Sequence, residues 1–536
     1  MTGWTDHLLV APIIVPMLAG AAMILAGDRR RGTVVALGLG STLLLAALSV
    51  VLLGMSATPG LRIYRLGDWP ALFGIVLALD RLSALMLALT AALGLAAFVF
   101  SLARWHRAGT HFHPLFQFQL MGLNGAFLTG DLFNLFVFFE VMLAASYGMA
   151  LHGSGTARVR AGLHYIVVNL VASLLFLIGV SVVYGISGTL NMADLAVRIR
   201  DVAAEDRALL EAGLAVMGIA FLTKAAMWPL GFWLPGTYAA AAAPAGAILS
   251  MLSKVGVYAL LRVWLLLFGS GAGASAGFGG TALLAGGLLT IAFGSVAVLA
   301  TQNLSRLAGA SVLVSSGTLL AAIGAGQAAV TGGALFYLAS SVLSIGAFFL
   351  LIELVERGRE VGADVLAVTR EAFGTGEEDE DPEATDEVGV PIPGTVAILG
   401  LGFIACALLL AGLPPLSGFL AKFAIIAALL GRGGSAVPAM GWVLVAALVL
   451  SGLATVVAMA RAGIDAFWAS PSGTVPRVGM IEIAPVGLLL ALCVGLTVAA
   501  GPAMDYMQAA AEALHAPGGY LRGVLAADAA MPRGGE

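Results

Sequence analysis

The sequence predicts an all-α polytopic membrane protein, and two observations support this. Of its 536 residues 60% are hydrophobic and only 10% are charged, which is too little polar surface to cover a water-soluble protein of this length. Charge-free stretches long enough to cross a bilayer as a helix also recur along the whole chain. The first of them has no basic region before it and is followed by further spans, so we expect a retained helix rather than a signal peptide.

The hydropathy pattern predicts about fourteen transmembrane helices. Their expected ranges are 8–26, 33–54, 82–101, 114–130, 132–151, 162–184, 209–228, 242–267, 280–301, 308–326, 330–355, 393–430, 438–460 and 482–501. The twelfth is unusually long and contains Pro414 and Pro415, so we expect two half-helices around an interruption. Most basic loops fall on one side of this arrangement, and because basic loops face the cytoplasm, both termini are expected outside.

Three segments are expected to lie outside the spans. Residues 190–207 carry apolar and charged side chains at helical spacing, which predicts a short surface helix. Residues 357–390 predict an acidic cytoplasmic loop, with eight acidic residues from Glu377 to Glu387. The tail after residue 502 is mildly amphipathic, and the sequence leaves open whether it lies on the membrane or is disordered.

Two of the expected spans share a local motif. Residues 229–232 read Pro-Leu-Gly-Phe and residues 415–419 read Pro-Leu-Ser-Gly-Phe. A lysine is close to each motif, Lys224 before the first and Lys422 after the second. Interrupted helices at corresponding positions indicate an internal repeat of the kind common in secondary transporters, with helix breaks at Pro229 and at Pro414 and Pro415.

The lysines are the strongest functional signal. The chain has 26 basic residues, but only Lys224, Lys254 and Lys422 are lysines, and all three fall in apolar spans. A cation inside a membrane costs several kcal/mol, so it persists where it is paired, hydrated or functional. A buried lysine can release its proton, whereas arginine stays charged. The pattern therefore predicts a proton relay.

Glu140 is the acidic counterpart of these lysines. It lies in the middle of the fifth expected span, among phenylalanines. A carboxylate in such a place can switch between a paired and an unpaired state, although sequence spacing does not show whether it meets Lys224. In the eighth span Ser250, Lys254 and Tyr258 recur every four residues, so they share one helix face that could hold a water wire.

A structural role is the alternative for each of these residues. The buried charges could form ion pairs or reach toward helix ends, and Asp80 and Asp131 are expected to be helix caps at span ends. Further polar side chains could support a relay or simply hydrogen-bond between helices; these are Asn134, Tyr147, Asn169 and His164, the last taken as the one histidine within an apolar span. Cys406 and Cys493 lie in apolar spans without metal-ligand spacing. No nucleotide, haem or catalytic-triad motif is visible, so neither an enzyme, a cofactor, a metal site nor a nucleic-acid partner is expected.

Four motifs occur in order along the chain: Gly130–Glu140, Lys224–Pro235, Ser253–Tyr258 and Gly412–Phe423. Together they resemble a known family, the antiporter-like subunits shared by Mrp antiporters, respiratory complex I and membrane-bound hydrogenases. The resemblance covers about residues 75–465. It implies a fourteen-helix fold with two inverted five-helix repeats, each containing a broken helix.

The resemblance also implies a division of the chain and a role for each buried charge. Residues 1–107 would form spans one to three, residues 108–268 the first repeat, residues 269–465 the second repeat with the acidic loop, and residues 466–536 the last span and tail. By the same resemblance Glu140 and Lys224 match the family's ion pair. Lys254 matches its central relay lysine and Lys422 the lysine that ends the proton path.

Departures from the family pattern favour its Mrp D-type branch. Complex I relatives usually have histidines where this chain has Gly231 and Tyr238, and residues 233–244 are similar to the pattern of the Mrp D-type subunits. The family's histidine and lysine in the eleventh span are replaced by serines, Ser340, Ser341 and Ser344 among them. Serines and water are therefore expected to bridge the middle of the relay.

The resemblance implies a proton-translocating subunit of a multisubunit Na⁺ or K⁺/proton antiporter in a bacterial plasma membrane. Its expected partners are the other subunits of an Mrp complex, membrane lipid, protons and the exchanged cation. Two alternatives stay open. One is a proton-pumping subunit of a redox complex, which would carry flavin, iron–sulfur or quinone partners. The other is a scaffold subunit that transports nothing.

Overall fold

The computed structural model describes residues 6–27, 30–58, 60–71, 74–357, 394–431, 437–468 and 478–529. These residues are mostly helical, as the sequence predicts. The helices are α1 (Ala11–Ala26), α2 (Arg31–Ala57), α3 (Arg81–Ser101), α4 (Phe112–Leu128), α5 (Leu132–Ala150), α6 (Thr156–Ser187), α7 (Met192–Arg198), α8 (Ala204–Lys224), α9 (Leu234–Ala240), α10 (Ala243–Ala259), α11 (Leu265–Phe268), α12 (Gly280–Ala300), α13 (Leu304–Gly324), α14 (Ala328–Glu356), α16 (Gly394–Ala411), α17 (Ser417–Leu430), α18 (Ala439–Phe467), α19 (Met480–Val498), α20 (Ala500–His515) and α21 (Gly518–Ala529).

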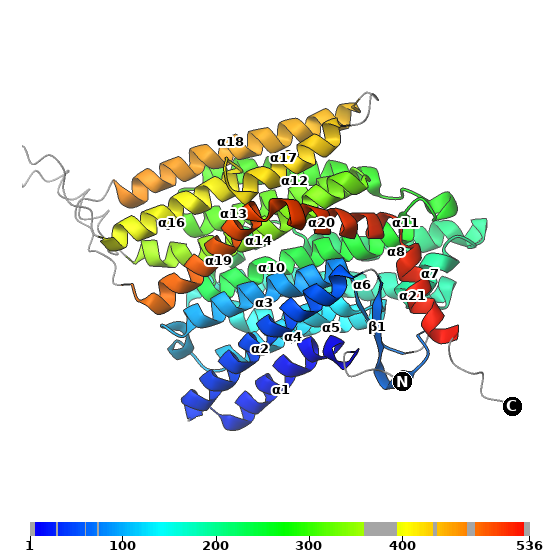
Figure 1. Cartoon of the computed structure of the whole chain (residues 1–536), viewed down its shortest axis with the longest axis horizontal. Coiled ribbons are helices and arrows are strands. Elements are labelled where there is room, and N and C mark those ends of the chain that lie inside the picture. The colour runs from blue at the N-terminus through cyan, green and yellow to red at the C-terminus, as the bar shows by residue number, and fades with distance from the viewer. Residues whose placement is uncertain are drawn as a thin grey trace, which may run out of the picture.

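The long helices run side by side in one bundle (Figure 1). Helix α14 lies at its centre, because it packs against α10 and α13 on one side and against α16, α17, α19 and α20 on the other. Every residue of its most apolar stretch is buried. The bundle is therefore held together by a helix that is hydrophobic all round, the pattern expected for a fully enclosed helix.

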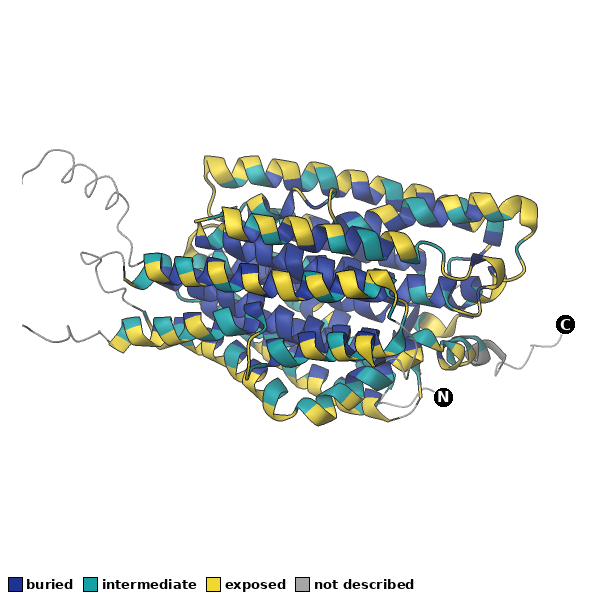
Figure 2. Cartoon of the chain, turned by 90° about the horizontal axis from the view of Figure 1, so that it is seen from above, coloured by how far each residue is buried: buried dark blue, intermediate teal, exposed yellow. Residues whose placement is uncertain are grey.

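The outer faces of the peripheral helices are exposed and apolar (Figure 2). On α6 they carry Leu163, Leu170 and Leu174, each 46% or more exposed. Large exposed apolar surfaces of this kind are rare on water-soluble proteins and normal where lipid is the solvent. Eleven helices in the described part of the chain are long and apolar enough to cross a membrane.

Each expected span falls on a helix or on a pair of half-helices, while the full number that crosses the membrane stays a prediction. The interruption of the twelfth span is confirmed, since α16 ends at Ala411 and α17 begins at Ser417. The surface helix expected over 190–207 is much shorter, only α7. Most of the expected acidic loop 357–390 lies outside the described residues.

The described tail is folded onto the bundle, so the prediction that left disorder open is wrong for this part. Helix α20 packs against α14 and α3, and α21 packs against α7 and β1. Met507, Ala510, Ala511 and Leu514 form the buried face of α20. The mild amphipathicity of the tail thus supplies an apolar face for protein rather than for a membrane surface.

A small β-hairpin was missed by the all-α prediction. Strands β1 (Arg62–Arg65) and β2 (Val76–Leu79) pair antiparallel, with Arg62 opposite Leu79 and Arg65 opposite Val76. All four residues of β2 are buried. The hairpin leads directly into α3, whose first turn is capped by Asp80. It also contacts the short 3-10 helix η1 (Asp6–Leu9) and α21, so both ends of the described chain meet at one end of the bundle (Figure 1).

Candidate functional site

The two helix breaks have a similar backbone geometry, in which a glycine lies against a carbonyl of the preceding chain. Helix α8 ends at Lys224 and α9 begins at Leu234, so the segment around Pro229 is not helical. In each break a glycine of the shared motif touches the preceding chain. A Cβ on Gly231 would lie 2.2 Å from the Ala226 carbonyl oxygen, and a Cβ on Gly418 would lie 2.0 Å from that of Leu409. Because real Cβ atoms never come so close, glycine is required at both positions.

Lys422 donates a hydrogen bond to a backbone carbonyl at the second break. Its Nζ donates a hydrogen bond of 2.9 Å to the carbonyl oxygen of Ala411, the last residue of α16. Carbonyls at a helix end have no partner within the helix, and an unpaired one inside a membrane is costly. The lysine is 6% exposed. The break therefore explains why a cation is held at this place.

Lys224 and Glu140 lie near one another without forming a direct ion pair. Lys224 is the last residue of α8 and 9% exposed, and its Nζ is 5.0 Å from the centroid of the Phe139 ring. The charge of Glu140 is close enough to attract it. The Glu140 Oε1 atom is buried and has no hydrogen-bond partner among the described residues. Glu140 and Lys224 therefore attract each other without direct contact.

A cavity of about 20 Å³ adjoins Lys224. Tyr165, Asn169 and Trp233 line it as well. The indole nitrogen of Trp233 is buried without a hydrogen-bond partner in the described part of the chain. Since about 10–15 Å³ suffices for one water molecule, this cavity can hydrate the lysine.

Lys254 is connected to the second half of the bundle through hydroxyl groups. The side chain is 1% exposed, and its Nζ donates a hydrogen bond of 2.8 Å to Oγ of Ser315 on α13. Ser315 in turn donates to Oγ of Ser341 on α14 at 3.0 Å. A buried cation and two hydroxyls thus form a hydrogen-bonded chain across three helices.

A second cavity of about 20 Å³ continues this chain. Its polar lining residues are Ser311, Ser315, Tyr337, Ser340, Ser341, Ser344 and Thr455. On its far side the hydroxyls of Ser340 and Ser417 lie 2.9 Å apart, and Ser417 is the first residue of α17. The serines that replace the family's usual histidine and lysine therefore lie between Lys254 and the second helix break.

The supporting residues named from the sequence take more local roles. The hydroxyl of Ser250 donates to the carbonyl of Ala247 in its own helix, and Tyr258 donates to the carbonyl of Phe127 at 2.6 Å. Asn134 donates a side-chain hydrogen bond to the hydroxyl of Thr129 at the start of α5. Asp131 is the N-cap of this helix, as expected, and accepts from the backbone N–H of Asn134.

Two further residues from the sequence stand apart from the buried charges. Tyr147 is half-buried, and His164 is exposed on the outer face of α6. The expectation that His164 is the one histidine within an apolar span is wrong. His113 lies in α4 and is 6% exposed.

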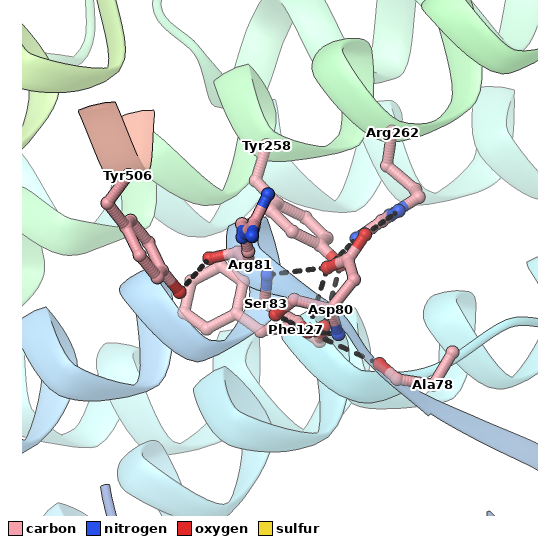
Figure 3. Close-up of polar contacts among 8 residues, drawn as sticks. All are labelled: Ala78, Asp80, Arg81, Ser83, Phe127, Tyr258, Arg262 and Tyr506. Carbon is pink, nitrogen blue, oxygen red and sulfur yellow. Dashed lines mark hydrogen bonds and ion pairs between the residues drawn. The ribbon is translucent and has the colours of Figure 1, made fainter. Parts of the chain in front are cut away.

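Sequence reasoning missed a buried arginine. Arg262 is 5% exposed in a π-helical turn, Leu260–Trp264, and both its terminal nitrogens donate to Asp80, at 2.6 and 2.7 Å (Figure 3). Asp80 also caps α3 by accepting from the backbone of Ser83 at 2.9 Å. It is the expected helix cap and in addition an ion-pair partner. The signal was present, because Arg262 continues the four-residue spacing of Lys254 and Tyr258.

Comparisons with known proteins identify the family and the fold. The family model described as NADH:quinone oxidoreductase/Mrp antiporter, TM matches residues 129–454. A protein from Rhizobium meliloti, named as the probable D subunit of a K(+)/H(+) antiporter, is 59% identical over 545 residues, covering 100% of both chains. The D subunit of a Na(+)/H(+) antiporter from Alkalihalophilus pseudofirmus is 33% identical, covering 97% of this chain and 99% of the relative.

Solved structures share the fold. A chain of the Mrp complex from Dietzia sp. has a TM-score of 0.81 at 24% identity, covering 98% of this chain and 100% of its own. A chain of the membrane-bound sulfane sulfur reductase, an archaeal respiratory membrane complex, has a TM-score of 0.80 at 23% identity, covering 98% and 100%. At such identities these structures show the fold alone. The matched family model and the relatives at 59% and 33% identity show more: the chain belongs to the NADH:quinone oxidoreductase/Mrp antiporter family, and within it to the D-type subunits of Mrp-type antiporters.

Proposed function

We propose that this chain moves protons across the membrane as one subunit of a multisubunit antiporter that exchanges K⁺ for protons. The observation that carries the proposal is the connection from Lys254 through Ser315 and Ser341 to a serine-lined cavity. A proton released by a lysine needs hydrogen-bonded acceptors or water to leave an apolar interior. The chain supplies hydroxyl acceptors and a cavity with room for a water at this place.

The first half of the proposed relay is Glu140 with Lys224. Their separation without an ion pair leaves each free to change partner when the other changes charge. The cavity beside Lys224 has room for the water that such a step requires. We place proton loading of the relay here.

The second half runs from Lys254 to Lys422. The Ser340–Ser417 contact brings the serine cavity to the first turn of α17, the helix that carries Lys422. Hydroxyls can both donate and accept, so a row of them transmits a proton without a titratable group. This bridges the place where the family usually has histidine and lysine.

The two breaks support an internal repeat within this proposal. Each combines a Pro-Leu motif, a lysine within a few residues, and a glycine pressed against a preceding carbonyl. The packing order is also the same in both halves: α4 with α5 and α6 with α9 in the first, α12 with α13 and α14 with α17 in the second. We propose that an inverted repeat relates them and that both breaks lie near mid-membrane depth.

The choice of K⁺ rests on the relative at 59% identity, whose name states K(+)/H(+) exchange, against 33% for one named for Na(+)/H(+). Its name and those of its relatives also imply assembly with other subunits. The test is reconstitution of the purified complex in vesicles with a pH-sensitive dye inside. We expect a K⁺ gradient to move protons faster than an equal Na⁺ gradient.

The same vesicles separate a transporting subunit from a scaffold. In a Lys254→Ala complex, exchange should be lost while every subunit is still present. Exchange at the normal rate in that complex would assign this chain a scaffolding role. A redox function is supported by the shared fold and by the joint family model, whereas the relatives at 59% and 33% identity are both named as antiporter subunits.

A further inference from the structure

A third cavity lies between the α1–α2 turn and the start of α4, and none of its lining residues belongs to the proposed relay. Its volume is about 190 Å³. The basic and histidine side chains on its wall are Arg31, His106, Arg107, His111 and His113. No acidic residue is among its described lining residues. The cavity is therefore suited to an anion.

His113 points to a missing ligand. Although it is only 6% exposed, neither ring nitrogen has a hydrogen-bond partner among the described residues. The rings around it belong to Phe98, Phe112 and His106, at centroid distances of 4.9, 5.7 and 6.3 Å, and the two phenylalanines offer no acceptor. Buried polar groups are nearly always paired, so an unpaired one on a cavity wall is explained by a ligand.

Positive charge gathers around this histidine. Arg107 donates through Nε to His106 at 3.2 Å, which leaves its terminal nitrogens for another acceptor. Burial lowers the pKa of His106, and the charges of Arg107 and Arg31 lower it further. Both arginines are therefore close to this wall of the cavity. A neutral His106 accepts from Arg107, and the two arginines supply the charge.

Two helix N-termini border the same cavity. Helix α2 begins at Arg31 and α4 at Phe112, and neither N-cap residue supplies a capping side chain. The first N–H groups of each helix thus lack an intrahelical partner, and the helix dipole favours a negative charge there. Phosphate groups commonly bind in such places.

One side of the cavity wall is apolar. Met23, Ile24, Val34 and Val35 line it from the facing sides of α1 and α2. Free phosphate has no apolar group to bury against this surface, whereas the glycerol and acyl part of a lipid would pack against it. We propose that this cavity binds the phosphate group of an anionic lipid, with Arg31 and Arg107 neutralising its charge and His113 donating a hydrogen bond. This site does not depend on the proposed proton relay.

The test uses the complete purified complex and a matched pair of variants. Arg31→Gln with Arg107→Gln removes the two arginines of the cavity. Arg30→Gln with Arg104→Gln removes the same charge from the same two loops, at exposed positions outside the cavity wall. Each complex is incubated with photoreactive phosphatidylglycerol or phosphatidylcholine, with and without inorganic phosphate, and cross-linked peptides are mapped.

We expect phosphatidylglycerol to label the cavity walls of the unchanged complex and of the Arg30/Arg104 control. In the Arg31/Arg107 variant labelling should fall by roughly thirtyfold, since each basic group near a membrane adds somewhat less than tenfold in affinity. His113→Phe should weaken labelling severalfold with the fold retained. We expect millimolar inorganic phosphate to lower phosphatidylglycerol labelling, because it competes with the lipid phosphate for the same two arginines.

Three results would overturn the proposal. The first is equal labelling by phosphatidylcholine. The second is equal loss in both arginine pairs, which would indicate general surface attraction. The third is cross-linking of the cavity to another subunit instead of lipid, which would make it a protein interface.

Discussion

The serine cavity can be tested by changing its volume and its hydroxyl groups separately. Ser341 accepts a hydrogen bond from Ser315 and lines the cavity. Ser341→Ala and Ser341→Val both remove that hydroxyl. Alanine enlarges the cavity, whereas valine puts two methyl groups where one hydroxyl was. The two variants therefore differ in the space left for water.

The magnitude follows from the cavity volume. About 20 Å³ is available, and about 10–15 Å³ is enough for one water. The additional methyl group of valine takes up about as much room as a water molecule, ~30 Å³, so it closes the cavity. Both variants lose a hydrogen bond worth ~1 kcal/mol, and valine adds an overpacking cost of ~1–3 kcal/mol. If the water is part of the path, exchange in Ser341→Val should be at least ~10-fold slower, which is ~1.4 kcal/mol in the barrier.

The assay is K⁺-driven proton movement in vesicles containing equal amounts of each complex, checked for subunit content by gel. Ser341→Ala should retain most of the exchange because water can replace the lost hydroxyl. Equal rates in the valine, alanine and unchanged complexes would show that protons do not pass through this cavity. Equal loss in both variants would mean that the hydroxyl itself, not the water space, is required.

Further variants probe the other members of the relay. Glu140→Gln should abolish exchange while assembly stays detectable on a native gel, and normal exchange would remove this carboxylate from the path. Lys254→Arg should fail nearly as badly as Lys254→Ala, since arginine does not release its proton; recovery with arginine would exclude proton release there. Pro414→Ala with Pro415→Ala should let the helix continue and slow exchange in vesicles without removing a titratable group; an unchanged rate would make the break purely architectural. Asp80→Asn keeps a capping side chain but leaves its arginine partner unpaired, so the complex should lose ~2 kcal/mol of stability, seen as a lower melting temperature; an unchanged melting temperature would show that the pair stabilises nothing.

The sequence was most informative where one property repeats along a helix. Apolar stretches located the long helices, since a helix in lipid must satisfy its backbone internally and be apolar outside. The breaks were visible because their prolines, which disfavour a helix interior, recur in a shared Pro-Leu motif near a lysine. The hairpin of β1 and β2 was not, because four-residue strands carry too little alternation to stand out from a loop. The fold of the tail depends on the surface of α14, which no local pattern reveals.

The site shows the same division. The three lysines and Glu140 could be named from the sequence because charges are rare in apolar spans. Their partners could not be named, since contacts such as Lys254 with Ser315 join residues 61 positions apart. Ser340, Ser341 and Ser344 could be named only through the family resemblance, because serines in a helix also bond their own backbone, as Ser311 does here. The Arg262–Asp80 pair could not be named because its members lie 182 positions apart, in the π-helical turn after α10 and at the start of α3.

The partners of Lys254 also indicate how hydration and proton movement are coupled. An ammonium group has three N–H donors, and among the described residues only Ser315 accepts one of them. The neutral amine has two donors and a lone pair, so it leaves one donor unpaired where the ammonium leaves two. Because an unpaired buried donor costs ~1–3 kcal/mol, the charged form requires water that the neutral form can do without. Lys224 has the same need, beside a one-water cavity and a carboxylate whose Oε1 has no partner in the described chain. Water entering the cavity beside Lys224 would therefore favour its charged form, and water leaving would favour release of its proton. Lys254 reaches the serine cavity through Ser315, so we expect water there to act on this lysine through that hydroxyl.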